Sequence, residues 1–143
     1  MKTKIILLMI PFFFLITGMG GCEEKINVTD LLHTWKFQGF GNTNDNYFEK
    51  ATPSDCDECY VLTFSEDGAF SGHSTTSGFS GEYTVDGKDI KIIDFIATEI
   101  YELGNGGKYL EKMNQIQRYE IIGNKLKLYY NQEQNYLLFN LLN

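Results

Sequence analysis

The 143-residue sequence contains few of the residues on which several common functions depend. Arg118 is its one arginine, and His33 and His73 are its two histidines. A single guanidinium group provides little capacity for bidentate binding of phosphate. Two imidazoles provide few ligands for a metal ion. The longest apolar run, residues 5–16, is shorter than the roughly 20 residues that a membrane-spanning helix needs. These shortages argue against nucleic-acid binding and against a permanent helical anchor at the N-terminus.

Proline is also scarce, with two residues, whereas aromatic residues make up 15% of the chain. This balance favours a packed domain over a disordered one. The formal net charge is -7, and removal of Lys2 and Lys4 with an N-terminal signal would change it to about -9. An acidic protein repels nucleic acid and anionic lipid headgroups. We therefore expect no nucleic-acid partner.

Residues 1–21 have the pattern of a bacterial signal peptide. Two lysines precede a short apolar run, and Gly20-Gly21-Cys22 resembles the small-small-cysteine end of a lipoprotein cleavage site. The resemblance implies that Cys22 is acylated after cleavage, and two or more acyl chains anchor a protein stably. The alternative is an ordinary signal peptide followed by a free cysteine. We expect a lipid-anchored protein of the cell envelope that contacts the membrane through its anchor, and Glu23 favours the outer membrane.

The mature chain is long enough for one domain with a modest core and too short for two. Its polar start predicts that residues 22–29 are the lipidated cysteine and a tether. Residues 30–143 are then left for a single β domain. Thr29 or Asp30 can cap a short helical turn before the first strand.

Alternating apolar and polar residues between turn residues predict that most of this domain is strand. Asp86-Gly87 and Gly123-Asn124 each separate two alternating runs, and both dipeptides tolerate the positive φ of tight hairpin turns. Strands are expected at 35–37, 60–64, 69–74, 81–85, 89–93, 118–122, 125–130 and 136–141. So many antiparallel strands in a short domain require closure or stacking. The predicted fold class is mainly β (α+β), with about eight antiparallel strands in a barrel-like sheet and one amphipathic helix.

Residues 108–117 carry the helical pattern. Tyr109, Met113 and Ile116 recur at helical spacing, with polar residues between them. We expect this apolar stripe to close one end of the barrel-like sheet. The side chains expected to fill the interior are Trp35, Phe37, Phe64, Phe70, Tyr83 and Phe139.

Residues 39–58 are the longest stretch rich in glycine, asparagine and acidic residues, and they are predicted to be a loop. Long surface loops tend to carry function. Tyr47 and Phe48 lie within this stretch and are the residues that we expect to contact a partner. Glu99 and Glu102 are interpreted as part of a solvated turn rather than as a pair of catalytic carboxylates.

Cys56 and Cys59 are the two cysteines that remain if Cys22 is acylated. Outside the cytoplasm such a pair is expected to form a structural disulfide. Free thiols, a redox centre and a metal site are the alternatives. Neighbouring acidic residues raise thiol pKa values, which disfavours redox catalysis, and zinc would need two further ligands. We expect no catalytic, cofactor-binding or metal-binding residues.

Several motifs, taken in order, resemble the META domain family of small bacterial envelope proteins. The residues that carry this resemblance are Leu31-Leu32-His33-Thr34-Trp35, Leu62-Thr63-Phe64, Gly68–Gly72, Gly81-Glu82-Tyr83, Ala97-Thr98 and Tyr119–Leu128. The resemblance covers residues 31–142, and so implies a META-like domain over residues 30–143. It implies an envelope lipoprotein that is stress-related in some members, without a general enzymatic activity. A lipocalin-like barrel is a second resemblance, because it shares the hairpins and the early tryptophan.

Three classes of function remain open on these grounds. The favoured one is a non-enzymatic envelope domain that contacts another envelope protein or a cell-wall component. The alternative is a lipocalin-like carrier of a small apolar ligand, and an enzyme is the third. A filled interior would favour the first class, and an open cavity would favour the carrier.

Overall fold

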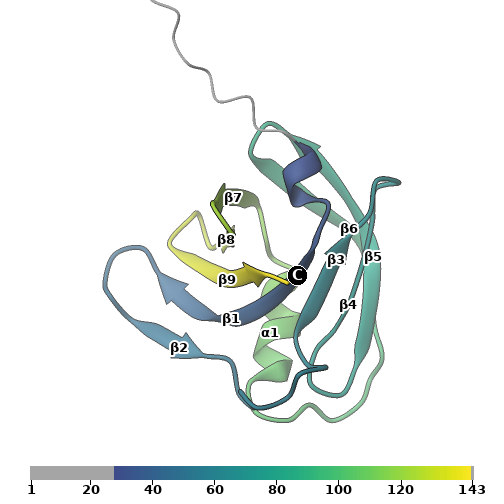
Figure 1. Cartoon of the computed structure of the whole chain (residues 1–143), viewed down its shortest axis with the longest axis vertical. Coiled ribbons are helices and arrows are strands. Elements are labelled where there is room, and N and C mark those ends of the chain that lie inside the picture. The colour runs from purple at the N-terminus through teal and green to yellow at the C-terminus, as the bar shows by residue number, and fades with distance from the viewer. Residues whose placement is uncertain (1–27, 143) are drawn as a thin grey trace, which may run out of the picture.

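The computed structural model describes residues 28–142 (Figure 1). The elements are the 3-10 helix η1 (Val28–Leu31), β1 (Thr34–Asn42), β2 (Phe48–Lys50), β3 (Val61–Phe64), β4 (Ala69–His73), β5 (Gly78–Asp86), β6 (Asp89–Ala97), α1 (Gly106–Met113), β7 (Arg118–Ile122), β8 (Lys125–Tyr130) and β9 (Asn135–Leu141). All strand pairs are antiparallel, and the nine-stranded sheet curves into a ring. The predicted fold class is confirmed. The expected signal peptide and Cys22 lie outside the described residues.

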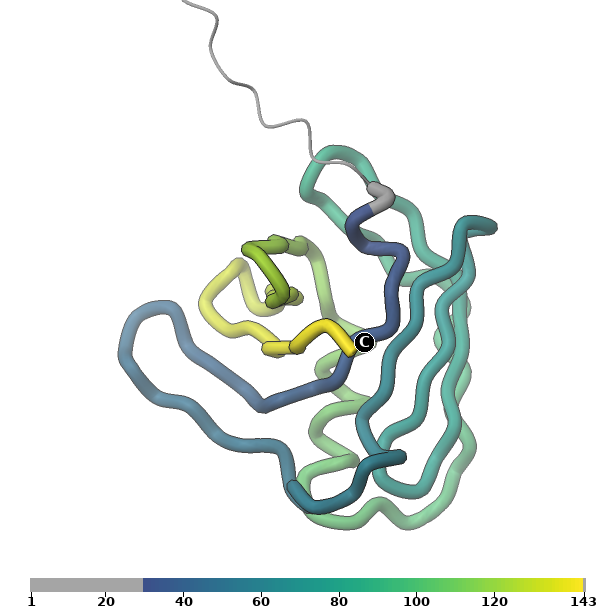
Figure 2. Tube along the Cα trace, viewed as in Figure 1, coloured from purple at the N-terminus to yellow at the C-terminus, as the bar shows by residue number. Residues whose placement is uncertain are grey.

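The ring closes where the first long strand meets the last. Strands follow the order β2-β1-β3-β4-β5-β6-β7-β8-β9, and β1 also pairs with β9. That second pairing joins seven residue pairs, from Trp35↔Leu141 to Asn42↔Asn135, and Figure 2 shows the two strands side by side. Strands β6 and β7, by contrast, meet at the single pair Asp89↔Arg118. The ring therefore has a long closure at β1–β9 and a short seam at β6–β7.

Strand β1 changes register halfway along its length. Trp35 and Phe37 are buried and alternate with partly buried neighbours, as the sequence pattern predicted. A bulge between Phe37 and Gly39 then shifts the pairing by one residue, so Phe40 also faces the interior. Because side chains alternate across a strand, Gly39 and Gly41 face outward. The bulge thus places two glycines on the outer surface of the closing strand.

The prediction that residues 39–58 form a loop is wrong at its start. Strand β1 continues to Asn42, and β2 follows at Phe48–Lys50 to form a hairpin. Glycine is depleted in strands because its backbone loses more entropy on folding and it has no side chain to pack. Gly39 and Gly41 therefore indicated a loop. In the structure, pairing on both edges of β1 compensates for them.

The predicted helix is displaced as well. Helix α1 begins at Gly106 and ends at Met113, whereas the sequence pattern extended from 108 to 117. The backbone N–H of Gln115 donates to the carbonyl of Lys112 at 2.9 Å, which tightens the last turn. Ile116 is buried all the same, from the connection to β7.

The interior of the ring is filled by side chains. All six residues expected there are buried, namely Trp35, Phe37, Phe64, Phe70, Tyr83 and Phe139. Helix α1 lies between the two sides of the ring (Figure 1). The ring of Tyr109 has its centroid 4.6 Å from that of Phe37 in β1 and 5.9 Å from that of Phe79 in β5. The apolar stripe of the helix therefore joins both sides of the sheet in one core.

Met113 provides a test of this packing, because its side chain is 0% exposed. Met113→Ala should lower the free energy of unfolding by about 2–4 kcal/mol, since it leaves a cavity in a close-packed interior. Ile122→Ala is the matched control. That isoleucine is 64% exposed, and its removal should change stability by less than about 0.5 kcal/mol. Urea denaturation of both variants checks the prediction, and equal effects would contradict the packed interior.

Candidate functional site

The outer surface of β8, β9, β1 and β2 carries three cross-strand rows of side chains. Residues that pair across antiparallel strands point to the same side of the sheet. The rows are Tyr129–Tyr136–Gly41–Phe48, then Lys127–Leu138–Gly39–Lys50, then Lys125–Asn140–Lys36. We call this surface the lysine–tyrosine face. Aromatic rings occupy one end of it, and lysines occupy the rest.

The two glycines of β1 shape this face. A Cβ atom built on Gly41 would collide with the ring of Tyr136, and one built on Gly39 would lie 2.7 Å from the ring of Phe48. The rings therefore lie directly against the bare backbone of β1. This use of glycine to seat an aromatic ring from a neighbouring strand recurs in β-sheets. Lys127 extends along the same surface, with its Nζ 4.5 Å from the centroid of the Tyr136 ring.

The tip of the β1–β2 hairpin is held by its own polar side chains. Asn42 Oδ1 accepts hydrogen bonds from the backbone N–H groups of Asn44 (2.8 Å) and Asp45 (3.3 Å). Asp45 Oδ1 accepts one from the backbone N–H of Tyr47 at 2.9 Å. Asparagine and aspartate commonly stabilise turns in this way. The tip thus contains its own hydrogen bonds, and it presents Tyr47 with 62% of its surface exposed and Phe48 with 39%.

A hollow of about 420 Å³ lies beside the hairpin tip. It is lined by Asn42, Thr43, Asp45, Asn46, Tyr47, Phe48, Lys127 and Tyr136. Small-molecule sites have volumes of about 300–1,000 Å³ and combine aromatic walls with a few polar groups. The hairpin hollow has this composition, with three aromatic rings and two carboxamides.

A second hollow, of about 360 Å³, adjoins the first through Phe48. Lys36, Lys50 and Lys125 line it, together with part of the disulfide loop. Lys36 Nζ donates to the carbonyl oxygens of Cys56, Asp57 and Cys59. Burial lowers the pKa of Lys36, and the nearby Asp57 opposes that shift. Lys36 therefore holds the loop in place, whereas Lys50 and Lys125 remain at the rim.

Cys56 and Cys59 form a disulfide, with their Cα atoms 5.3 Å apart. The predicted pairing of the two cysteines is confirmed. The bond closes the four-residue loop Cys56–Cys59, and three of its carbonyls accept hydrogen bonds from Lys36. It therefore helps to shape one wall of the second hollow.

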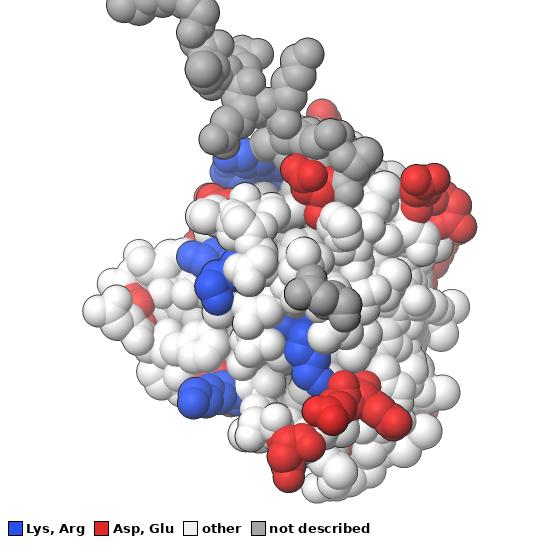
Figure 3. All heavy atoms as spheres, in the orientation of Figure 1, with Lys and Arg blue, Asp and Glu red and all other residues white. Residues whose placement is uncertain are grey.

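Basic and acidic side chains are unevenly distributed on the surface. On the side seen in Figure 3, most lysines lie over the centre and left, and most acidic groups lie at the right and lower margins, where some adjoin a central lysine. The salt bridges among residues 28–142 join Lys108 to Glu49, Lys112 to Glu111 and Arg118 to Glu133. Each of these basic groups lies off the lysine–tyrosine face. The four lysines of the face form no salt bridge within the described part of the chain.

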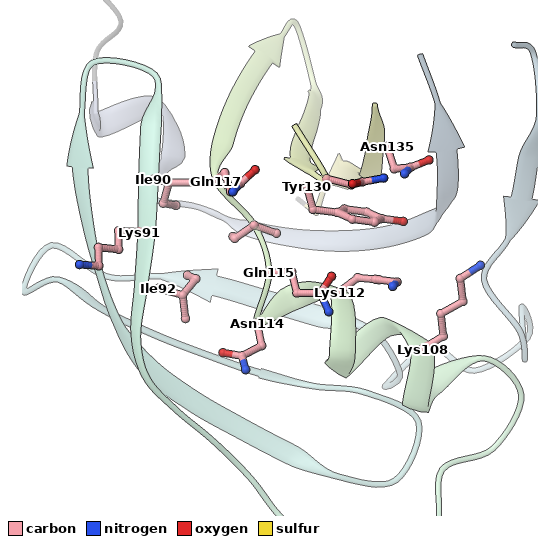
Figure 4. A pocket seen from close by; sticks show the side chains of 12 residues that line it. Ile90, Lys91, Ile92, Lys108, Lys112, Asn114, Gln115, Gln117, Tyr130 and Asn135 are labelled. Carbon is pink, nitrogen blue, oxygen red and sulfur yellow. The ribbon is translucent and has the colours of Figure 1, made fainter. Parts of the chain in front are cut away.

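A wider groove, of about 980 Å³, follows the seam between β6 and the connection from α1 to β7 (Figure 4). Carboxamides and three lysines line it, but Lys91 points away from it in Figure 4. Lys108 and Lys112 are engaged by glutamates at 2.7 and 3.1 Å. Hydrogen bonds from Lys108 and Asn105 lower the pKa of Glu49. The groove therefore offers less unpaired charge than the lysine–tyrosine face.

Glu102 is not the solvated carboxylate that we expected from the sequence. Its Oε2 accepts hydrogen bonds from the backbone N–H and hydroxyl of Thr75, at 3.1 and 2.5 Å, and from the N–H of Thr76 at 3.2 Å. Burial opposes ionisation of Glu102. Hydrogen bonds from the turn at residues 74–77 outweigh this effect, with Ser77 and Thr75 contributing most, and lower the pKa of Glu102 to about 2. Glu102 thereby fixes the loop that precedes α1, and has a structural position.

Glu102→Gln should lower the free energy of unfolding at pH 7 by about 1–3 kcal/mol, because it removes charge-assisted hydrogen bonds. The folded-state pKa lies below the ordinary value of 4.5. The contribution is therefore present above about pH 4.5 and is lost as the pH falls towards 2. The difference between wild type and variant should shrink over that interval in urea titrations. Glu99→Gln, at an exposed position, is the control, and a constant difference for Glu102→Gln would refute the assignment.

The structure brings together some predicted site residues and leaves others apart. Tyr47 and Phe48 are exposed on the hairpin, as expected, and Cys22 lies outside the described residues. Sequence reasoning missed Tyr136 and the lysines of β8, although the alternation at 125, 127 and 129 indicated that they share a face. Among residues 28–142, no three His, Cys, Asp or Glu side chains gather as a metal site. No helix in that range is long and apolar enough to cross a membrane.

Comparison with known proteins gives a family match and similar solved structures. The family described as "Domain of unknown function (DUF4847)" matches residues 25–141. A crystal structure of a DUF4847 family protein from Bacteroides vulgatus ATCC 8482 is similar, with a TM-score of 0.60 and 18% identity over 80% of this chain and 96% of that one. An NMR structure of a protein from Burkholderia xenovorans has a TM-score of 0.63 and 21% identity over 80% and 86%. No curated protein matches the chain.

The family match corrects the resemblance to META domains. The motifs behind that resemblance, such as Gly81-Glu82-Tyr83, consist of turn residues and alternating apolar residues. Any antiparallel hairpin selects these residues for its turn and its buried face. They therefore report hairpins in sequence order, which the structure contains, and not a shared ancestry.

Proposed function

The chain belongs to the DUF4847 family, whose function is unknown, and from its own geometry we propose that it is a non-enzymatic binding domain of the bacterial cell envelope that holds cell-wall glycan. The observation that carries the proposal is the aromatic end of the lysine–tyrosine face. There, Tyr47 and Phe48 are exposed on an ordered hairpin beside Tyr136 and two asparagines.

Aromatic rings and carboxamides suit a sugar ligand. The face of an aromatic ring carries partial negative charge, and the C–H groups of a sugar ring carry partial positive charge, so the two stack. Asn42 and Asn46 line the same hollow and can exchange hydrogen bonds with hydroxyl or N-acetyl groups. Because the tip is already held by Asn42 and Asp45, little ordering entropy opposes binding.

The packed interior argues for this class of function over an apolar carrier. The aromatic residues that line the inside of the ring are buried and contact one another, for example Phe37 with Tyr109 and Phe64 with Tyr83. Close-packed native interiors leave few voids larger than a water molecule. A ligand would therefore bind on the outside, where the aromatic rings of the hairpin are exposed.

The proposed location in the envelope rests on the sequence around Cys22. Acylation there would tether the domain through residues 22–29, and Figure 1 shows the described chain beginning at η1, away from the β1–β2 hairpin. This arrangement suits a domain that reaches from a membrane to the cell wall.

Tyr47→Ala should weaken binding of soluble peptidoglycan fragments by about fivefold to tenfold, because it removes a stacking ring of an exposed site. Tyr101→Ala is the matched control, since Tyr101 is 84% exposed on the loop between β6 and α1. Its loss should leave the dissociation constant unchanged. Isothermal titration of both variants measures the effect. Absence of binding by wild type, or equal loss in the two variants, would refute the proposed site.

Cys22→Ala should yield a protein without acyl chains that partitions into the aqueous phase on detergent extraction. The reason is that the thiol of Cys22 is the expected attachment point of the lipid, and a protein without acyl chains has no anchor. Intact-mass analysis of wild type provides the direct check. An unmodified Cys22 in the mature wild-type protein would overturn the lipid-anchor proposal.

A further inference from the structure

We propose that the glycan held by this domain is anionic, and that its carboxylates bind Lys50, Lys125 and Lys127 while a sugar ring stacks at the hairpin. This inference rests on the proposed function and names the chemical class of its ligand. Neighbouring rows on this face are two residues apart along each strand. The first lysine row therefore lies about 7 Å from the aromatic row. One extended chain of sugars can therefore contact both rows.

The two hollows of the lysine–tyrosine face form one continuous surface. Phe48 lines both of them. Lys127 lines the hairpin hollow, and Lys50 and Lys125 line the second one. A ligand that leaves the stacking position at Tyr47 along this surface therefore passes Phe48 and reaches the lysines. The arrangement fits a polymer better than a single sugar.

The charges of this face are available to a ligand. Lys127 lies over the Tyr136 ring, and Lys125 Nζ donates to Asn140 Oδ1 at 3.1 Å, so both ammonium groups contact neutral partners. Lys50 is exposed and has no salt bridge among the described residues. By contrast, Lys108 and Lys112 on α1 are both paired with glutamates. In a protein of net charge -7, lysines that gather on one face and form no salt bridge among the described residues favour binding of external anions there.

Glu120 and Asp45 are the acidic residues nearest to Lys127, and each accepts a hydrogen bond within the protein. Glu120 lies opposite Lys127 in the β7–β8 register without forming a salt bridge to it, and accepts a hydrogen bond from the hydroxyl of Tyr129 at 3.3 Å. Burial, and then Glu120, raise the pKa of Tyr129 to about 12, so this phenol remains a neutral donor. Asp45 binds the N–H of Tyr47, and no acidic side chain lines the second hollow.

Lys36 is excluded from the proposed ligand contacts. Its ammonium group donates to three carbonyls of the disulfide loop and is partly buried. A change at Lys36 would therefore disturb the loop and confound a binding test. Lys50 and Lys125 are better positions, because both side chains are exposed at the rim of the hollow.

The test compares soluble peptidoglycan fragments that keep their carboxylates with the same fragments after amidation, using the protein purified from cells that express the full chain. Wild type should bind the anionic fragments about fivefold to tenfold more tightly, because two or three exposed ion pairs contribute this much. Added salt should reduce that preference. The double variant Lys50→Gln/Lys125→Gln should lose the preference and keep the affinity for amidated fragments.

Lys88→Gln/Lys91→Gln is the matched control, because it removes the same charge from the region of the β5–β6 hairpin. It should retain the preference for anionic fragments. If Tyr47→Ala weakens binding while amidation and the Lys50/Lys125 changes have no effect, the glycan function stands and the anionic assignment is overturned. If polyglutamate competes as well as the anionic fragments do, the ligand is an acidic polypeptide, and this inference is overturned too.

Discussion

The closing strand β1 is the constraint on which the rest of the structure depends. It pairs with β9 along one edge, and with β3 and then β2 along the other. A strand with both edges occupied must place its side chains strictly inward or outward, and the bulge after Phe37 resets that alternation once. Phe37 and Phe40 then pack inside, with ring centroids 5.0 Å apart. Gly39 and Gly41 face outward, where rings from neighbouring strands cover them.

The closure also explains why the proposed ligand surface lies outside the ring. Tyr109 of α1 packs between β1 and β5, so the curved sheet is filled from within. On the opposite surface, the rings of Phe48 and Tyr136 lie against the glycines of β1. The packed core and the proposed site thus lie on opposite faces of β1. A substitution that enlarged Gly41 would disturb the outer rings first, because the Tyr136 ring is the nearest group to its Cβ position.

Local sequence signals predicted most of the strands. The features that they did not predict depend on pairing between residues far apart in the sequence. Turns such as Asp86-Gly87 are formed by adjacent residues, so the hairpins could be recognised from the sequence. Strand β2 could not, because its partner residues Gly39 and Gly41 favour loops when considered alone. Of the candidate site, Tyr47 and Phe48 were identifiable as aromatic residues in a polar stretch. Tyr136 joins them only through the β1–β9 register, which no local pattern specifies.

The central claim is that ligand binds on the outer surface of the closing strands. The most direct measurement is a heteronuclear NMR titration of the labelled protein with soluble peptidoglycan fragments, followed at each backbone amide. The account predicts that shifts concentrate at Gly41, Tyr47 and Lys127, with little change in β3 to β5. Shifts centred on Ile90 and Ile116, which line the seam groove, or on Tyr109 in the buried core would contradict it.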